Sequence, residues 1–361
     1  MRIVVTGTRG IPNIQGGVET HCEELYPRLA NLGCEVILIR RSRYVSQNNK
    51  IKSYNGVVIK DIYAPRQKEL EAIFHTFLSV FYAKKVKADI LHIHAIGPAI
   101  MTPLARLLGL KVVVTHHGQD YNRHKWGKIA KMILKTGERL STKYANELII
   151  ISEDINDIIK RKYKRFNANL IHNGVNIPVK SNATTYIQSL GLTPQKYVFT
   201  LGRFVKEKGF HGLIEAFKKL NTESYKLVIA GDADQPDRYF ENLKRMAKEN
   251  DVVLTGFIKG EKLNELFSNA KLFVLPSFHE GLPISLLEAM SYDIDVLISD
   301  IQANLEVNLP DDYYFECGNW DDLRNKMEEK LIRNEHIKYD LSKYNWDHIA
   351  EQTIAVYQRI K

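Results

Sequence analysis

The stretch KLFVLPSFHEGLPISLLEAMS, residues 271–291, decides the fold that the sequence predicts. Its first part, KLFVLP, is a short apolar run typical of a strand buried on both faces of a parallel sheet. A turn follows, and Pro283 suits the first position of a helix that continues as SLLEAMS. The unpaired N–H groups and the dipole of such a helix end favour phosphate. The stretch therefore predicts a strand, a loop and a helix N-terminus that forms an anion site.

Two carboxylates flank this anion site. Glu280 lies in the loop, and Glu288 lies roughly a turn and a half into the helix. A carboxylate can accept hydrogen bonds from two hydroxyl groups at once. A phosphate site between two carboxylates that bind hydroxyl groups suggests a nucleotide sugar as the ligand.

Apolar strand-like runs alternate with amphipathic segments on both sides of a turn-rich connector at 169–196, and this alternation predicts two doubly wound parallel sheets. The α/β pattern restarts after the connector, so we expect two similar domains. The final segment has Trp346, Ile349, Ile354 and Tyr357 near helical spacing and should pack one face on a domain. The expected strands are 2–7, 35–40, 56–64, 89–95, 111–117 and 146–152, and then 197–203, 226–232, 252–258, 271–277 and 295–300.

Composition narrows the class of protein. The chain of 361 residues is 44% hydrophobic and carries a formal charge of +9, which favours an anionic partner. MRIVVTG enters a strand pattern at once, so we expect no secretory leader, and no apolar run reaches about 18 residues, so we expect no membrane-spanning helix. Three scattered cysteines are too few for a disulfide framework, which favours a reducing cytoplasm. Helix-turn-helix, finger and RNA-binding patterns are missing, so sequence-specific binding of nucleic acid is not expected.

The first turn, GTRGIPNIQGGVETHCEEL at 7–25, is rich in glycine. Its glycines do not match G-x-G-x-x-G, and the second strand ends without an acid, so a nicotinamide enzyme is disfavoured. Gly16 and Gly17 open a helix, where they could let the backbone approach a phosphate or a sugar. A flexible turn is the alternative, and we favour the ligand-binding interpretation.

Polar side chains gather after the fifth strand. His116, His117, Asp120 and Tyr121 lie at the carboxyl end of that strand, where open α/β sheets place ligands. The sequence lacks an H-E-x-x-H motif, so a metal site is not expected. His92 and His94 share one side of a neighbouring strand and are interpreted as packed residues or as residues near the cleft, not as metal ligands.

Two predicted helices have features that are also found in helices that lie on a membrane surface. The helix within 123–143 carries seven cations against Glu138, and either an anionic membrane or solvent fits that face. The earlier helix at 69–88 has a broad apolar stripe that ends in lysines, and we expect that stripe to pack into the core. The seven cations are Arg123, Lys125, Lys128, Lys131, Lys135, Arg139 and Lys143.

A second pair of charges follows the first strand of the second domain. In YVFTLGRFVKEKGFHGLIEAFKKL, residues 197–220, Arg203 and Lys208 come after the strand and just before a helix that starts near Gly209. Two cations at the carboxyl end of a strand can hold a diphosphate, with Arg as a fork and Lys as a point charge.

At these residues the chain resembles the retaining glycosyltransferases of family four, which have the GT-B fold. The resemblance rests on GRFVKEKGFHGLIEAF, VVLTGFI and PSFHEGLPISLLEAM, and it covers essentially the whole chain. The N-terminal half resembles bacterial rhamnosyltransferases and related surface-polysaccharide transferases. The resemblance implies an acceptor-binding Rossmann-like domain at 1–178 that faces, across a cleft, a nucleotide-sugar-binding domain at 179–344. It also implies that a C-terminal helix at about 345–361 packs back on the first domain.

The resemblance also implies roles for single residues. Arg203 and Lys208 would hold the donor diphosphate, Glu288 the ribose, and Glu280 the hydroxyl groups of the donor sugar. Gly281, Leu282 and Pro283 would line the sugar and phosphate site, Ile258 would contact the base, and His117 would lie near the reacting sugar. The remaining expected contacts are Gly16 and Gly17 with the donor, and Glu19, Asp120 and Tyr121 with the acceptor.

These roles predict a cytoplasmic, metal-independent transferase that needs no cofactor besides a UDP- or dTDP-linked sugar. Its expected partners are that donor and a glycan or lipid-linked acceptor. The inner face of the membrane is a further candidate partner of the basic helix, and a solvated helix face is the alternative. Rhamnose or another hexose would be transferred. The alternatives are a nucleotide-sugar epimerase or phosphorylase of the same fold, and a non-catalytic basic protein that binds membranes or nucleic acid.

Overall fold

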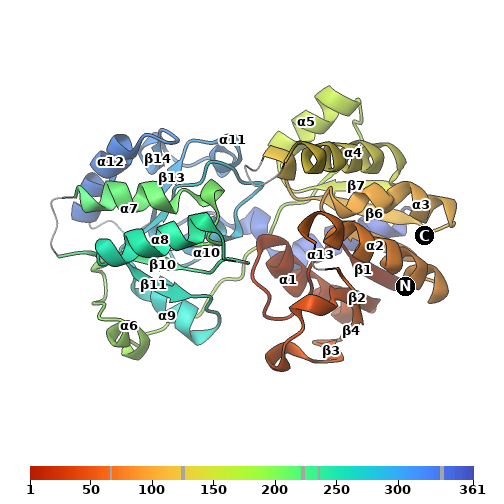
Figure 1. Ribbon diagram of the computed structural model, residues 1–361, viewed down its shortest axis with the longest axis horizontal. Coiled ribbons are helices and arrows are strands. Elements are labelled where there is room, and N and C mark those ends of the chain that lie inside the picture. Colours follow the sequence, from red (N-terminus) through yellow and green to blue (C-terminus); the bar gives the residue numbers. More distant parts are fainter. Residues whose placement is uncertain (66, 123–126, 221–223, 235, 334–336) are drawn as a thin grey trace. The chain divides into compact units, whose positions relative to one another are not determined.

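The computed structural model describes residues 1–65, 67–122, 127–220, 224–234, 236–333 and 337–361. The chain divides into two units. Unit 1 comprises Met1–Gly174 and Tyr344–Lys361, and unit 2 comprises Val175–Lys343. The last segment of the chain therefore belongs to the same unit as the first (Figure 1).

Unit 1 is built on an eight-stranded sheet in the order β3-β4-β2-β1-β5-β6-β7-β8. Its pairings are parallel except for β3 with β4, so the apolar runs are buried on both faces, as expected for a parallel sheet. The strands are β1 Arg2–Thr6, β2 Glu35–Arg41, β3 Ser53–Tyr54, β4 Val57–Ile62, β5 Ile90–His94, β6 Val112–His116, β7 Glu147–Ile150 and β8 Asn169–Leu170.

The helices of unit 1 cover both faces of this sheet. The chain leaves β1 toward β2 through α1, and it later crosses in the opposite direction to β5, β6 and β7. Because such crossovers are right-handed, α1 covers one face and α2, α3 and α4 cover the other. The helices are α1 Gly17–Asn31, η1 Ser42–Tyr44, η2 Gln47–Asn49, α2 Lys68–Lys85, η3 Pro98–Met101, α3 Thr102–Leu107, η4 Asp120–Asn122, α4 Lys128–Tyr144, α5 Glu153–Tyr163 and α13 Trp346–Gln358.

The C-terminal helix α13 completes the core of unit 1. It packs against α1, and it buries Trp346, Ile349 and Tyr357, as its helical spacing predicted. Gly174 allows this packing, since a Cβ atom there would lie 2.5 Å from Cδ2 of Trp346. The Tyr357 hydroxyl also contacts Nδ1 of His92 at 2.6 Å, inside the sheet.

Unit 2 has a six-stranded parallel sheet in the order β11-β10-β9-β12-β13-β14. Its strands are β9 Tyr197–Leu201, β10 Lys226–Ala230, β11 Val253–Gly256, β12 Leu272–Leu275, β13 Asp295–Ser299 and β14 Tyr314–Phe315. Its helices are α6 Thr185–Ser189, η5 Lys206–Lys208, α7 Phe210–Lys218, α8 Arg238–Glu249, α9 Glu261–Asn269, α10 Ile284–Ser291, α11 Gln302–Leu305, η6 Asp311–Tyr313 and α12 Trp320–Ile332, and the short η7 Ser342–Tyr344 follows.

The predicted fold class, two doubly wound parallel sheets, is confirmed. Every apolar run that was expected to be a strand contains one, whereas the two-residue strands β3, β8 and β14 were not predicted. None of the helices within the described residues has the length and the apolar composition needed to cross a membrane.

One prediction about packing is wrong. The apolar stripe of α2 was expected in the core, but Phe74, Phe77 and Phe81 are 43%, 38% and 45% exposed. The buried face of the helix carries Val80 and Ala83 together with polar side chains such as His75 and Ser79. The physical reason is the ion pairing of Glu71, which is described below.

Candidate functional site

The site residues of unit 2 gather where its sheet changes direction. From β9 the chain moves to β10 and β11 on one side, and then to β12, β13 and β14 on the other. Open α/β sheets bind ligands outside the carboxyl ends of the strands at such a point. Arg203 and Lys208 follow β9, and Glu280 follows β12. The two loops contact each other, since the Phe278 N–H donates to the Glu207 carbonyl at 2.8 Å.

Lys208 and Glu280 form an ion pair between these loops. The Lys208 ammonium donates to Oε1 of Glu280 at 2.6 Å, and the two side chains are 18% and 11% exposed. Burial would raise the pKa of the Glu280 carboxyl, but the Lys208 charge and hydrogen bond outweigh burial and lower it. Glu280 is therefore an ionised acceptor. Because an ammonium has three N–H donors, Lys208 can hold Glu280 and still donate to a phosphate oxygen.

Arg203 lies five residues before Lys208, in the same loop after β9. Its Nη1 donates to Oδ2 of Asp234 at 3.0 Å, and Asp234 comes just after β10. The guanidinium is 16% exposed. A guanidinium carries five N–H donors in a planar fork, a geometry that suits the oxygens of carboxylates and phosphates.

Gly209 lets the Lys208 loop approach β12. Its φ of +68° lies in the left-handed region, and a Cβ atom there would lie 2.0 Å from the Pro276 carbonyl oxygen. Gly209 is also the residue that caps α7 at its N-terminus. The glycine thus starts a helix and places Lys208 against the end of the neighbouring strand.

Residues 271–291 form a strand, a loop and a helix, as predicted, but the helix starts later than expected. Helix α10 begins at Ile284, so Pro283 is the N-cap residue and not the first helical residue. Leu282 and Pro283 are buried, and Gly281 and Glu288 are half-buried. Ile258 follows β11 and is 9% exposed. The structure thus places the expected donor-binding residues of unit 2 in loops that follow strands, and Glu288 inside α10.

Unit 1 has its own switch point, between β1 and β5. The backbones approach closely there, since a Cβ atom on Gly7 would lie 2.2 Å from the His94 carbonyl oxygen. His94 Nδ1 lies 2.8 Å from Nε2 of His117, and the His117 ring centroid lies 5.0 Å from that of His21 on α1. Nδ1 of His21 contacts Oδ1 of Asn173 at 3.0 Å. Three histidines from three elements therefore meet at the carboxyl ends of the strands.

This histidine trio, His21, His94 and His117, is neutral. Burial lowers the pKa of His21 to about 4, and it lowers the pKa values of His94 and His117 well below the ordinary value. Neutral imidazoles can donate, accept or bind a metal ion. Among the described residues, these three histidines form the cluster whose geometry could hold a metal ion. One ring nitrogen of each lies within 4.8 Å of the others. Sequence reasoning did not predict this cluster, although the H-x-H pattern at 92–94 was a signal for it.

The glycine-rich loop after β1 is held by Glu19. Its Oε1 accepts from the Arg9 N–H at 2.9 Å and from the Thr8 hydroxyl at 3.1 Å, and the residue is 6% exposed. Gly16 has a φ of +148°, and a Cβ atom there would lie 2.1 Å from Oε2 of Glu19. A Cβ atom on Gly17 would meet only open space. The structure thus places Gly17 at an open surface and gives Glu19 contacts with its own loop.

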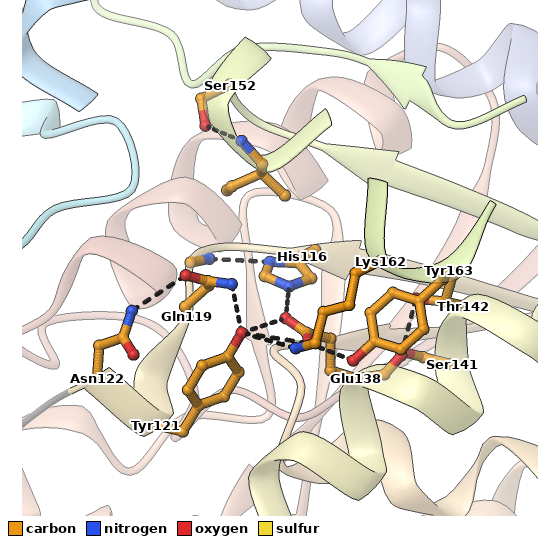
Figure 2. A network of polar contacts seen from close by, with 12 residues as sticks. His116, Gln119, Tyr121, Asn122, Glu138, Ser141, Thr142, Ser152, Lys162 and Tyr163 are labelled. Atoms are coloured by element: carbon orange, nitrogen blue, oxygen red, sulfur yellow. Dashed lines mark hydrogen bonds and ion pairs between the residues drawn. The ribbon is translucent and has the colours of Figure 1, made fainter. Parts of the chain in front are cut away.

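A buried carboxylate organises the segment that carries His117 (Figure 2). Glu138 of α4 is fully buried, and its Oε1 lies 3.1 Å from Nε2 of His116 and 3.1 Å from the Tyr121 hydroxyl. Lys162 of α5 donates to Oε2 at 2.6 Å, and the Tyr163 hydroxyl donates to the same oxygen. Figure 2 shows these side chains pointing toward Glu138 from the end of β6, from η4 and from α5.

These contacts set the state of Glu138 and His116. Burial would raise the pKa of Glu138, but hydrogen bonds from His116, Lys162 and Tyr163 outweigh it and lower the pKa to about 2. Nδ1 of His116 accepts from the Gly118 N–H at 3.2 Å, so Nε2 carries the hydrogen that is donated to Glu138. The ionised Glu138 thus fixes both ends of the His116–Tyr121 segment, which includes His117 and Asp120. Sequence reasoning missed this role, and the signal was a lone acid in a basic helix.

The basic face of α4 is exposed. Lys128, Lys135, Arg139 and Lys143 are exposed, and Lys131 is half-buried. The predicted cations Arg123 and Lys125 lie outside the described residues.

Comparison with known proteins gives two family matches. Residues 15–178 match the model described as Glycosyltransferase Family 4, and residues 182–346 match the model described as Glycosyl transferases group 1. An uncharacterized glycosyltransferase of Methanocaldococcus jannaschii is 26% identical over 389 residues, covering 99% of this chain and 98% of that protein.

Two further proteins show a similar sequence or fold. The Escherichia coli UDP-Gal:alpha-D-GlcNAc-diphosphoundecaprenol alpha-1,3-galactosyltransferase is 29% identical over 260 residues, covering 68% of this chain and 66% of the other. The structure of sucrose-phosphate synthase from Thermosynechococcus elongatus has a TM-score of 0.84 at 19% identity, and it covers 99% of this chain and 98% of its own. This likeness identifies the fold as GT-B.

Proposed function

We propose that this chain, which belongs to the glycosyltransferases of the GT-B fold, moves a hexose from a nucleoside-diphosphate sugar to a lipid-linked or other glycan acceptor. The product would enter cell-surface polysaccharide synthesis. The galactosyltransferase of Escherichia coli supports this choice of substrates, because its name specifies a UDP-linked donor and a diphosphoundecaprenol-linked acceptor.

The observation that carries the proposal is the group of charges at the switch point of unit 2. Arg203 and Lys208 are partly buried cations at the carboxyl end of β9, and the Lys208 ammonium lies 2.6 Å from Glu280. A nucleoside diphosphate gains negative charge as it leaves the sugar, and cations already in place stabilise that charge. Arg203 and Lys208 would supply this stabilisation without a metal ion.

The same loops would bind the rest of the donor. Glu280, ionised beside Lys208, would accept hydrogen bonds from the sugar hydroxyl groups, and Glu288 would accept them from the ribose. Gly281, Leu282 and Pro283 would line the sugar and phosphate site, and Ile258 would contact the uracil or thymine base. We propose a UDP- or dTDP-linked donor, with rhamnose or another hexose as the sugar.

Unit 1 would supply the acceptor side. The neutral His117 would lie near the reacting sugar and Gly16 and Gly17 near the donor, while Glu19, Asp120 and Tyr121 would contribute to the acceptor site. We propose transfer with retention, in which the leaving phosphate helps to remove the proton of the acceptor hydroxyl group on the same face of the sugar. The reaction would take place in the cytoplasm at the inner face of the membrane, which the cations of α4 would contact.

Turnover with a panel of nucleotide sugars tests the proposal. Release of nucleoside diphosphate should depend on an acceptor, and Arg203→Ala or Lys208→Ala should lower turnover by more than about tenfold, since a hydrogen bond to a charged group contributes about 1.5–3 kcal/mol. Lys219→Ala is the matched control, because Lys219 pairs with Asp321 on the exposed surface of the same unit.

Two results would overturn parts of this proposal. Turnover within a few-fold of the parent in both Ala variants would remove Arg203 and Lys208 from the donor site. Loss of turnover in EDTA, followed by recovery with zinc, would contradict a metal-independent reaction. The histidine trio would then be the candidate metal site.

A further inference from the structure

Helix α2 exposes its most apolar face. Leu70, Phe74, Phe77 and Phe81 are 50%, 43%, 38% and 45% exposed, and their spacing places them on one side of the helix. We call these four residues the α2 aromatic stripe. Its rings touch one another, with centroids of Phe77 and Phe81 5.0 Å apart and those of Phe74 and Phe77 6.5 Å apart. A continuous exposed apolar surface of this kind marks an interaction site.

The orientation of the helix is fixed by what it buries. Glu71 accepts from Nη1 of Arg41 at 3.0 Å and from Nη1 of Arg43 at 2.6 Å, and it is 5% exposed. Turning the aromatic face inward would break this buried ion pairing, which is strongly unfavourable. His75, Thr76 and Ser79 are buried on the same side as Glu71. The exposure of the stripe is thus a stable property of unit 1.

Cations lie near the C-terminal end of the stripe. Lys84 and Lys85 are exposed at the end of α2, and Lys87 is exposed just after it. Lys60 on the neighbouring strand β4 lies 5.8 Å from the Tyr82 ring centroid. Glu71 provides the carboxylate among the α2 side chains that the structure describes, and it is buried and paired with Arg41 and Arg43. The surroundings of the stripe therefore favour an anionic partner and disfavour a second copy of the same basic surface.

A second helix on the same face of the sheet also exposes apolar side chains beside cations. α4 lies on the same face of the sheet as α2, and η3 contacts both helices. α4 exposes Ile129 (72%) and Met132 (61%) beside its cations. Apolar side chains flanked by lysines match the interfacial region of a bilayer, where rings enter the boundary of the acyl chains and ammonium groups meet anionic headgroups.

We propose that the α2 aromatic stripe inserts into the surface of an anionic membrane and docks unit 1 there, with α4 on the same face of the unit. This inference deepens the proposed function in one respect, because docking at a bilayer brings the enzyme to a lipid-linked acceptor. The proposed function includes only electrostatic attraction of the α4 cations to the membrane. The inference adds that apolar side chains of α2 insert into the bilayer and anchor the protein.

Sedimentation with vesicles tests the docking surface. The full-length protein should bind phosphatidylcholine vesicles that contain phosphatidylglycerol, and it should bind pure phosphatidylcholine weakly. The triple variant Phe74→Ser/Phe77→Ser/Phe81→Ser should bind the anionic vesicles about tenfold more weakly or worse, because each ring loses its apolar transfer energy. The matched control is Ile177→Ser/Val179→Ser/Ile332→Ser, which alters three exposed apolar residues of unit 2 and should bind like the parent.

Insertion is tested separately from adsorption. Phe77→Trp should place an indole in the bilayer, so brominated lipids should quench its fluorescence after subtraction of the parent signal. Quenching equal to that of the parent would show that the helix stays outside the bilayer and would overturn the inference. Unchanged vesicle binding by the triple Ser variant would do the same.

Two controls separate this inference from its rivals. A parent that is dimeric by light scattering without lipid, and a triple Ser variant that is monomeric, would show that a second copy covers the stripe and would overturn membrane docking. UDP or dTDP should raise the melting temperature of the parent and of the triple Ser variant equally, which shows an intact fold. If neither UDP nor dTDP stabilises either protein while vesicle binding follows the stripe, the donor proposal fails and the docking inference stands.

Discussion

At the scale of single residues, buried histidines make the stability of unit 1 depend on pH. Burial lowers the pKa of His21 to about 4 and that of His92 to about 3. An unfolded chain takes up protons on these side chains below about pH 6.5, whereas the folded chain does not. The free energy of unfolding should therefore fall by roughly 2 kcal/mol per histidine between pH 7 and pH 5. Denaturant titrations at both pH values measure this change, and His348→Gln, at an exposed site, should not alter it. A flat profile would contradict the prediction.

Glu138→Gln should destabilise unit 1. The ionised carboxylate accepts from His116, Lys162 and Tyr121, and a neutral amide cannot replace all three contacts. We expect a loss on the order of 2–3 kcal/mol in the free energy of unfolding, and a drop in turnover because His117 lies on the segment that Glu138 holds. Thermal melts and turnover measure both effects. Glu351→Gln, at an exposed site on α13, is the matched control and should behave like the parent.

Residue types were easier to predict than their partners. Arg203, Lys208 and Glu280 were singled out because cations and acids after strands suit a phosphorylated sugar. The ion pair between Lys208 and Glu280 was not predicted, since the two residues are separated by 72 positions and meet only through the sheet order β9-β12. Glu138 shows the same limit, because its burial depends on partners in α5 that no local pattern reveals.

At the scale of elements, Gly209 caps the start of α7 and lies against Pro276, just after β12. Gly209→Ala should therefore disturb both the start of α7 and its approach to β12. A side chain there would meet the Pro276 carbonyl oxygen and would also strain a φ of +68°. We expect a loss of more than about 2 kcal/mol in stability and a fall in turnover as the Lys208 loop shifts. Gly191→Ala is the control, since its φ is also +68° but its nearest neighbour, Nζ of Lys226, lies 3.9 Å away. That variant should lose about 1–2 kcal/mol and keep its turnover. Equal losses in both variants would contradict the role of the close approach.

Strands could be predicted because their apolar runs are buried on both faces, which leaves a continuous signal. The two-residue strands β3, β8 and β14 leave no such signal, because they pair at sheet edges. The packing of helix α2 was predicted wrongly for a physical reason: an apolar stripe shows which residues share a face, but not which face packs inward. In α2 the ion pairs of Glu71 with Arg41 and Arg43 decide that orientation.

At the scale of the whole molecule, the chain order does not follow the division into units. Unit 1 takes its last helix from the C-terminus, after the whole of unit 2. The core of unit 1 includes Trp346, Ile349, Val356 and Tyr357 of that helix. The folding of unit 1 therefore depends on residues that come after unit 2 in the chain, whereas unit 2 draws its sheet from one continuous segment.

Deleting residues 345–361 should therefore unfold unit 1 selectively. The deletion removes the apolar side chains that cover α1, and truncating one large buried ring alone typically costs about 3–5 kcal/mol. Hydrogen exchange measured by mass spectrometry should show fast uptake in α1 and β1 and slow uptake in β9 and β12, as in the parent. Trp346→Ala should give a milder version of the same pattern, and Ile332→Ala, at an exposed site of unit 2, should leave exchange unchanged. Slow exchange in α1 after the deletion would mean that the rest of unit 1 folds without α13. Fast exchange throughout both units would mean that unit 2 also depends on this helix.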